Sequence, residues 1–336
     1  MKFYEIRETR GIDSLRPAEG PAREAGPGEV LIRVHAVSLN YRDLLIAQGR
    51  YMRGLKLPLI PLSDGAGEVV ETGSGVTRVK RGDRVAGIFM QNWLSGEVSP
   101  YVPRIALGGS VDGMLAEYVV LHENGVVHFP SHLSYEEAAT LPCAAVTAWN
   151  ALTDWGLRPG VSVLAQGTGG VSMFALQFAK LAGARVITTS SSDEKLRKAA
   201  DLGASDCINY RSVPDWDKRV LELTNNVGVD HIVEVGGPGT LARSMNAVRV
   251  GGRISIIGLL TGTETPVNPM PILGKQIQVQ GIFVGSREMF DGMNRAIALH
   301  QMRPVIDRVF PFDQARQALR FLESAAHFGK IVIRTV

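Results

Sequence analysis

The chain has 336 residues, of which 45% are hydrophobic and 21% charged, as is typical of a folded protein with two domains. The 36 basic and 33 acidic residues nearly balance, without a lysine or arginine run, which argues against nucleic acid or an anionic membrane as a partner. No apolar run is long enough to span a bilayer, residues 1–10 do not resemble a signal sequence, and the two cysteines lie far apart. We therefore expect a cytoplasmic protein without a disulfide scaffold.

The first part of the chain predicts a mostly β domain with many glycine and proline turns. The strands expected there are Gly28–Val37, Gly65–Thr72, Arg84–Phe89 and Met114–Leu121. Residues 91–109 form an irregular insertion, and loops of this kind commonly shape binding pockets.

Residues 161–172 combine an apolar strand, a glycine-rich turn and the start of a helix, which is the arrangement that binds a pyrophosphate. Gly167 permits a tight turn, Gly169 leaves room for phosphate oxygens, and the helix from Gly170 directs its N-terminal N–H groups toward the anion. The expected cofactor contacts of this turn are Gly167, Thr168, Gly169, Gly170 and Val171. Ser172 replaces the third glycine of G-x-G-x-x-G, so the contact between helix and strand must accept a hydroxyl. An ordinary strand-to-helix turn is the alternative.

Strands and helices alternate after this turn. The expected strands are Ala184–Thr189, Asp206–Asn209, Asp230–Val235, Arg253–Gly258 and Gln276–Phe283. The expected helices between them are Glu194–Leu202, Asp217–Thr224 and Leu241–Val248. Because such alternation builds a parallel sheet covered on both faces, residues 143–285 predict a doubly wound α/β nucleotide-binding domain.

The end of the second strand of this domain bears on the choice of dinucleotide. An acidic residue there would bind the adenosine ribose and repel a 2′-phosphate, but Ser190 occupies that place. Hydroxyls, an ammonium and a guanidinium nearby suit a phosphate, which favours NADPH over NADH. The cofactor contacts expected here are Ser190, Ser191, Ser192, Lys195 and Tyr210. Alternatively, Ser192 caps a helix whose first turn contains Asp193 and Glu194.

The chain after residue 285 predicts two helices, Arg287–Gln301 and Gln314–Ser324, followed by a strand at Lys330–Arg334. We expect this last strand to return to the first domain.

Four further motifs stand in a characteristic order along the chain. They are Asp64–Val70, Val79–Val85, Leu141–Ala148 and Gly329–Ile333. Together with the Gly-x-Gly-Gly-Val turn, this order resembles the medium-chain dehydrogenase/reductase superfamily over essentially the whole chain. The resemblance implies an α/β fold with a β-rich, GroES-like catalytic domain (1–142 and 286–336) and a Rossmann dinucleotide-binding domain (143–285).

The sequence departs from this family where its zinc-dependent members bind metal. The resemblance puts the catalytic zinc ligands at Asn40, Ser63–Asp64 and Cys143, and an amide and a hydroxyl do not replace a thiolate and an imidazole. The structural zinc lobe of such relatives falls near residues 91–108, a stretch without cysteine. We expect no zinc in either place.

Without a Lewis acid, hydride transfer to an enone, enal or quinone is easier than oxidation of an alcohol, provided that side chains stabilise the enolate and supply a proton. The segments Asn40–Asp43 and Gly49–Tyr51 resemble the zinc-free quinone oxidoreductase and enoyl reductase branches of the superfamily. The resemblance implies Tyr51 as proton donor and Asn40 as the group that orients the substrate oxygen, with Tyr41 in a supplementary role. A tyrosine that only covers the domain face is the alternative for Tyr51.

The resemblance and the positions of loops after strands imply further contacts with the cofactor. These are Thr147, Gly236, Gly258, Leu259, Val284, Gly285 and Lys330, for the last of which a surface position is the alternative. The family also implies a homodimer paired through the sheet edge near Gln276–Phe283. Three other functions stay open: a zinc-type alcohol dehydrogenase, a non-catalytic NADPH-binding protein and an NADH-dependent enzyme.

Overall fold

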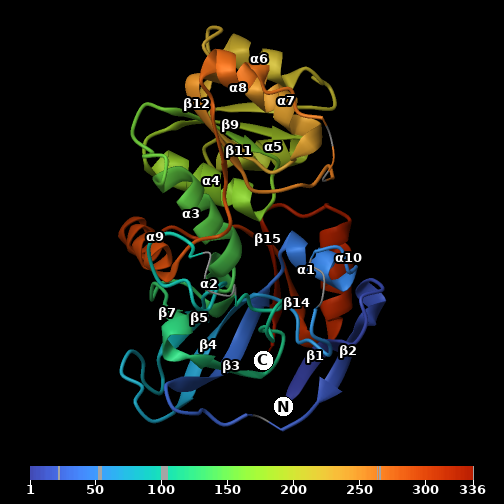
Figure 1. Cartoon of the computed structure of the whole chain (residues 1–336), viewed down its shortest axis with the longest axis vertical. Coiled ribbons are helices and arrows are strands. Elements are labelled where there is room, and N and C mark those ends of the chain that lie inside the picture. Colours follow the sequence, from blue (N-terminus) through green and yellow to red (C-terminus); the bar gives the residue numbers. More distant parts are fainter. Residues whose placement is uncertain (22, 52–54, 100–104, 263, 265, 336) are drawn as a thin grey trace. The chain divides into compact units, whose positions relative to one another are not determined.

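The computed structural model describes residues 1–21, 23–51, 55–99, 105–262, 264 and 266–335 (Figure 1). The chain divides into two compact units, one formed by Met1–Val146 with Gly285–Val336 and the other by Thr147–Val284. The sequence predicts boundaries after residues 142 and 285, so residues 143–146 and Gly285, expected in the second unit, belong to the first.

The first unit is mostly β, as the turn-rich sequence predicts, and its strands pair antiparallel except for the last two along the chain, which are parallel. Its strands are β1 (Lys2–Ile6), β2 (Leu15–Glu19), β3 (Glu29–Ser38), β4 (Asp64–Thr72), β5 (Arg84–Gly87), β6 (Tyr118–His122), β7 (Val126–His128), β14 (Ile306–Pro311) and β15 (Lys330–Arg334). The large sheet has the order β14-β15-β3-β4-β5-β7, with β6 also paired to β3, and β1 and β2 form a separate hairpin. The prediction that the last strand returns to this unit is confirmed, because β15 pairs with β3.

Short helices complete the first unit. They are α1 (Tyr41–Ala47), α2 (Tyr135–Ala138), α9 (Arg287–His300) and α10 (Ala315–Glu323), with 3₁₀ turns at Ile12–Ser14, Glu123–Gly125 and Phe312–Gln314 and a π-helical turn at Leu141–Ala145. The apolar face of α10 packs on β14, β15 and α1, and its buried side chains join one core with those of β3 and β15. This core holds the end of β3, the start of α1 and the start of β15 together.

The second unit is a six-stranded parallel sheet. Its strands are β8 (Ser162–Gln166), β9 (Arg185–Ser190), β10 (Asp206–Asn209), β11 (Val229–Glu234), β12 (Val248–Ile256) and β13 (Gln278–Gly281). Its helices are α3 (Val146–Thr153), α4 (Gly170–Leu181), α5 (Asp193–Asp201), α6 (Trp216–Leu223), α7 (Pro238–Ala247) and α8 (Met270–Lys275). The strand order β10-β9-β8-β11-β12-β13 is that of a Rossmann fold, so the doubly wound prediction is confirmed.

The strand order reverses between β8 and β11, and ligands of doubly wound sheets bind beyond the carboxyl ends of the strands at such a point. The loops after Gln166 and Glu234 therefore lie where sheets of this kind bind their ligands.

Most element boundaries differ from the prediction by one or two residues, and the larger differences are at β6, which begins at Tyr118 and not at Met114, and at α7 and β12. Helix α7 begins at Pro238, because Gly237 has a positive φ of 84° and proline suits the first helical position. Val248, expected to end that helix, instead starts β12, which runs through Gly251 and Gly252. Among the described residues, no helix is long and apolar enough to cross a membrane.

Candidate active site

The start of α1 turns Asn40 inward. Asn40 has extended backbone at the N-cap position, and its N–H donates to Asp43 Oδ2 at 2.8 Å. Asn40 and Asp43 are both buried. Burial raises the pKa of the Asp43 carboxyl to about 6, against the opposing effect of the Arg42 charge. Tyr41, also predicted to be catalytic, is 40% exposed, so the helix presents these two predicted residues to different surroundings.

Strand β15 brings Lys330 to Asn40. The ammonium donates to Asn40 Oδ1 at 2.7 Å and to the carbonyl oxygen of Leu39, and the residue is only 3% exposed. Val332 lies opposite Ser38 in the antiparallel register, so Lys330, two residues earlier in β15, lies beside the residues that follow β3. The surface position considered for Lys330 is therefore wrong, and its contact with a cofactor stays a prediction.

Asp64, the first residue of β4, lies close to the same ammonium. Ser63 Oγ donates to Asp64 Oδ1 at 2.7 Å, and the backbone N–H of Cys143 donates to Asp64 Oδ2 at 3.2 Å. Burial raises the pKa of Asp64, and Lys330 opposes this most strongly. Burial likewise lowers the pKa of Lys330, and Asp64 is the main group that opposes it. The two charges therefore compensate each other inside the protein.

Cys143 lies in the π-helical turn Leu141–Ala145, a type of irregularity that is common at functional sites. The residue keeps some exposed surface, but its thiol is surrounded by protein. This burial, with a further contribution from Asp64, raises the pKa of the thiol strongly. Cys143 is therefore a neutral thiol at pH 7, not a thiolate.

Tyr51 packs against the guanidinium of Arg42. The guanidinium carbon lies 5.0 Å from the centre of the Tyr51 ring and 4.5 Å from that of Phe89, and Arg42 Nη1 donates to the Leu107 carbonyl oxygen at 2.9 Å. Burial raises the pKa of the Tyr51 hydroxyl, while Arg42 lowers it, and Cys143 is near enough to raise it further. The structure thus brings Asn40, Tyr51 and Cys143 into one cluster of the first unit.

The donor atoms of this cluster do not suit zinc. The ligand positions hold an amide, a hydroxyl, the Asp64 carboxylate and one thiol. The carboxylate already accepts hydrogen bonds from Ser63 and from the Cys143 N–H, and the Lys330 ammonium contributes a positive charge beside it. Within the part of the chain that the structure describes, no group of three or more His, Cys, Asp or Glu residues is placed to hold a metal ion. Residues 100–104 of the segment expected to correspond to a structural zinc lobe lie outside the described residues.

The glycine turn after β8 has room for a ligand. A Cβ added at Gly167, where φ is 72°, or at Gly169 would meet nothing within 4 Å. Gly169 caps α4, which starts at Gly170. The Ser172 hydroxyl donates to the Gln166 carbonyl at 2.5 Å, which shows how the helix accepts a serine in place of the third glycine. Open space at a helix N-terminus fits a dinucleotide pyrophosphate.

A buried carboxylate that the sequence analysis missed joins this turn to the next loop. Glu234, at the end of β11, accepts hydrogen bonds from five donors. These are Gly236 N (2.8 Å), Gly237 N (2.9 Å), Thr240 Oγ1 (2.6 Å), Gln166 Nε2 (2.8 Å) and Ser244 Oγ. Gln166 and Glu234 are neighbours because β8 and β11 are adjacent in the sheet. The local sequence therefore does not predict these hydrogen bonds.

Other predicted glycines of the second unit are required by packing. A Cβ on Gly236 would lie 2.2 Å from Thr240 Oγ1, and one on Gly258 would lie 2.4 Å from the Val235 carbonyl oxygen. Leu259, which follows Gly258, is half exposed. Close packing in ordinary turns is therefore enough to explain why Gly236 and Gly258 are glycines.

The serines at the end of β9 differ in burial, and two of them make structural hydrogen bonds. Ser190 is buried, and its carbonyl accepts the Tyr210 N–H at 3.0 Å, which holds Tyr210 next to the strand end. Ser192 Oγ accepts the Lys195 N–H at 3.3 Å and so caps α5, as the helix-start interpretation predicts. Ser191 lies between them, partly exposed. Capping and phosphate binding are compatible at such a helix start.

Three predicted cofactor residues lie near the unit boundary. Thr147 is buried in α3. Val284 has a positive φ of 52°, which is a strained conformation for a β-branched residue, and its carbonyl accepts Asn150 Nδ2 at 2.7 Å. A Cβ on Gly285 would lie 2.6 Å from the Val146 side chain, so a larger residue does not fit there.

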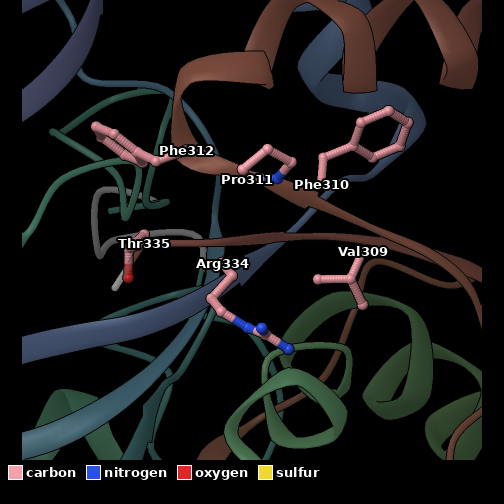
Figure 2. A pocket seen from close by; sticks show the side chains of 6 residues that line it. All are labelled: Val309, Phe310, Pro311, Phe312, Arg334 and Thr335. Carbon is pink, nitrogen blue, oxygen red and sulfur yellow. The ribbon is translucent and has the colours of Figure 1, made fainter.

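A separate hollow of about 550 Å³ lies on the first unit (Figure 2). It is lined by Val309, Phe310, Pro311, Phe312, Arg334 and Thr335. Arg334 Nε donates to Glu136 Oε1 at 2.8 Å, and none of the residues predicted to be catalytic lines this hollow. It therefore contributes nothing to the cluster around Asn40.

Comparison with known proteins identifies the family. Residues 26–131 match the alcohol dehydrogenase GroES-like domain, and residues 170–298 match the zinc-binding dehydrogenase family. The chain is 46% identical over 342 residues to the zinc-type alcohol dehydrogenase-like protein C1773.06c of Schizosaccharomyces pombe, with 99% of each chain covered. It is 28% identical over 340 residues to acryloyl-coenzyme A reductase of Metallosphaera sedula, with 99% and 96% covered.

Solved structures agree. A putative alcohol dehydrogenase from Sinorhizobium meliloti 1021 is 44% identical, with a TM-score of 0.93 and 99% and 98% of the chains covered. Escherichia coli quinone oxidoreductase complexed with NADPH, 24% identical over the whole of both chains with a TM-score of 0.85, shares the fold. The chain belongs to the medium-chain dehydrogenase/reductase superfamily. The relatives are oxidoreductases, which makes this protein an enzyme of that class.

Proposed function

We propose that this enzyme is a zinc-independent, NADPH-dependent reductase of activated C=C bonds or quinones. The observation that carries the proposal is the cluster around Asn40, in which an amide and a hydroxyl stand at two of the expected metal-ligand positions and the Lys330 ammonium donates to the amide oxygen. The similarity to an acryloyl-coenzyme A reductase supports an activated alkene as substrate. The "zinc-type" name of the fungal relative supports the competing alcohol dehydrogenase, so the metal is part of the test.

The residues of the cluster suit such a reduction. Bound NADPH supplies a hydride to the electron-poor carbon of the substrate. Asn40 Nδ2 would donate a hydrogen bond to the carbonyl oxygen, where negative charge develops. Tyr51 holds its proton at pH 7, as a phenol with an ordinary or raised pKa does, and it would give that proton to the reduced substrate. The nearby Arg42 guanidinium would stabilise the phenolate that remains.

The preference for NADPH rests on the end of β9. Ser190, Ser191 and Ser192 stand where an NAD-binding domain places an acidic residue, and Lys195 follows in the first turn of α5. Hydroxyl, N–H and ammonium donors suit a 2′-phosphate. The open space at Gly167 and Gly169 is where the pyrophosphate would bind.

Purified enzyme should oxidise NADPH faster than NADH when quinones, enones and an acryloyl thioester are offered. Oxidation of primary and secondary alcohols with NADP should be slower, and metal analysis should find much less than one zinc per chain. Treatment with a chelator should leave the rate unchanged. Stoichiometric zinc with alcohol oxidation would show an alcohol dehydrogenase instead, and tight NADPH binding without turnover across the panel would show a non-catalytic role.

We further propose a homodimer in the cytoplasm. Strand β13 ends the parallel sheet with all four residues exposed, and the neighbouring α8 exposes Met270 and Leu273, the latter by 74%. Pairing of β13 with a second copy would cover this edge. Light scattering should give twice the mass of 36.3 kDa, and Val279→Lys should shift it toward one chain.

A further inference from the structure

We infer that Lys330 is a positioning residue: its ammonium fixes the Asn40 amide with the oxygen facing the lysine, so that the amide NH₂ is the side available to a substrate oxygen. The role in turnover rests on the proposed function. The orientation of the amide does not, and it is testable without any substrate.

The chemistry of the two groups determines this orientation. An ammonium has three N–H donors and no acceptor, so the amide atom 2.7 Å from Lys330 Nζ must be the oxygen. The Leu39 carbonyl takes a second hydrogen of the same ammonium. These two hydrogen bonds hold the Lys330 ammonium in place. If the Asn40 amide rotated by half a turn, its NH₂ group would face the N–H donors of the ammonium and the hydrogen bond would be lost.

Asp64 acts on the other end of the amide. The Asn40 amide is close enough to lower the pKa of Asp64, which means that its positive NH₂ end is attracted to the carboxylate. Lys330 and Asp64 therefore pull opposite ends of one side chain. An NH₂ group has two hydrogens, and Asn40 Nδ2 is buried with no hydrogen-bond partner at standard distance among the described residues. A buried donor of this kind is unusual in a native protein and marks a place where a ligand atom completes the set.

The same arrangement explains how the site works with donors that do not suit zinc. The positive charge of Lys330, compensated by Asp64 and Asp43, lies where related enzymes hold a metal, but it contacts Asn40 and not a substrate. Lys330 thus acts through Asn40.

Kinetics test the role in turnover. With the best substrate of the panel, Lys330→Met and Asn40→Leu should each lower kcat at least tenfold. The double variant should lose no more than the worse single variant, because both remove one function, and Lys330→Arg should recover part of the rate. Losses that multiply in the double variant would overturn the inference.

Nuclear magnetic resonance of protein labelled with ¹⁵N-asparagine tests the orientation alone. The side-chain NH₂ signals missing from Asn40→Leu identify Asn40, and they should shift in Lys330→Met but much less in Lys330→Arg. The Asn150 signals, from an amide bonded to Val284 in the other unit, serve as the control. If Lys330→Met does not fold, the double variant Lys330→Met with Asp64→Asn is used in its place, because it removes both buried charges together. Unchanged Asn40 signals would overturn the inference, whereas shifted signals in an enzyme without turnover would overturn only the proposed function.

Discussion

Two buried polar networks in this enzyme differ in how completely their groups are paired. The Glu234 carboxylate in the second unit accepts five hydrogen bonds, two of them from backbone N–H groups of the following loop. The cluster around Lys330 in the first unit balances its charges, yet Asn40 Nδ2, Arg42 Nε and Asp43 Oδ1 have no hydrogen-bond partner among the residues that the structure describes. In the first network the carboxylate is fully bonded and Gln166 Oε1 is the atom left without a hydrogen-bond partner, whereas in the second network three buried polar atoms lack one among the described residues.

This difference separates a scaffold from a reactive site. A fully bonded carboxylate fixes the loops that approach a cofactor, and it gains nothing from a ligand. Unpaired buried groups are costly in the folded protein, so a site that keeps them is suited to bind a polar ligand atom. Substitutions in the two networks should therefore affect different quantities: stability and cofactor binding near Glu234, and turnover near Lys330.

The largest effect is expected from Tyr51→Phe. Loss of the hydroxyl should lower kcat on the order of 100-fold, because general acid catalysis contributes that much or more. The Kd for NADPH should stay within about twofold, since Tyr51 lies in the first unit. Tyr118→Phe, in β6 and outside the predicted site, is the control, expected to behave as wild type. Steady-state kinetics and a fluorescence titration measure both, and an unchanged kcat would exclude Tyr51 as the proton donor.

Glu234→Gln should affect stability first. A neutral amide sets its own NH₂ group against the Gln166 and Ser244 donors, so the free energy of unfolding should fall by about 2 kcal/mol. NADPH binding should weaken as the loop after β11 loosens. Urea unfolding and fluorescence titration give the two values. The surface variant Glu222→Gln should change neither quantity appreciably, and a fully stable Glu234→Gln would show that the network does not hold the loop.

Ser190→Asp should reverse the cofactor preference. A carboxylate at the end of β9 repels the 2′-phosphate, and the ratio of kcat/KM for NADPH over NADH should fall at least about tenfold. Ser190→Asn, of equal size and without charge, should retain most of the preference. If aspartate and asparagine lower the ratio equally, the effect comes from packing at this buried position and not from charge.

Asp43→Asn should change the pH dependence of stability. Because the folded pKa of about 6 exceeds the ordinary 3.8, the native protein holds this proton more tightly, and stability due to Asp43 falls as pH rises from 4 to 6. In the variant, the free energy of unfolding should no longer fall with pH on account of this group, a slope of at most about 1.4 kcal/mol per pH unit. Urea unfolding between pH 4 and 7 measures it, with the exposed Asp13→Asn as control. Parallel profiles for Asp43→Asn and wild type would contradict the raised pKa.

Much of the fold could be predicted from local sequence. The strands Asp206–Asn209 and Lys330–Arg334 have the predicted bounds, because alternating apolar residues and flanking turn residues mark a strand wherever it lies. The β1–β2 hairpin and β14 were not predicted, since Pro17 and the mixed polar residues of Ile306–Pro311 weaken the strand pattern. Those strands depend on pairing with distant segments.

The site was predictable only in part. Asn40 and Tyr51 stand in recognisable segments, and the glycine turn at 167–171 carries its own signal. Lys330 is 290 residues from Asn40, and Gln166 is 68 residues from Glu234, so no spacing rule connects them. Whether Lys330 lies at the surface or in the interior depends on the pairing of its strand, β15, with β3, which is distant in sequence.

The sequence by itself determined the succession of elements, the glycine turn and the amide and hydroxyl at two expected zinc-ligand positions, because each depends on the residue types present and their local spacing. The tertiary structure alone decided which polar groups meet. The pairing of β15 with β3 set a lysine ammonium against an asparagine amide, and the neighbouring positions of β8 and β11 gave Glu234 its partners. Burial then shifted the pKa values of Asp43, Asp64 and Cys143, since desolvation depends on the whole fold and not on neighbours in sequence.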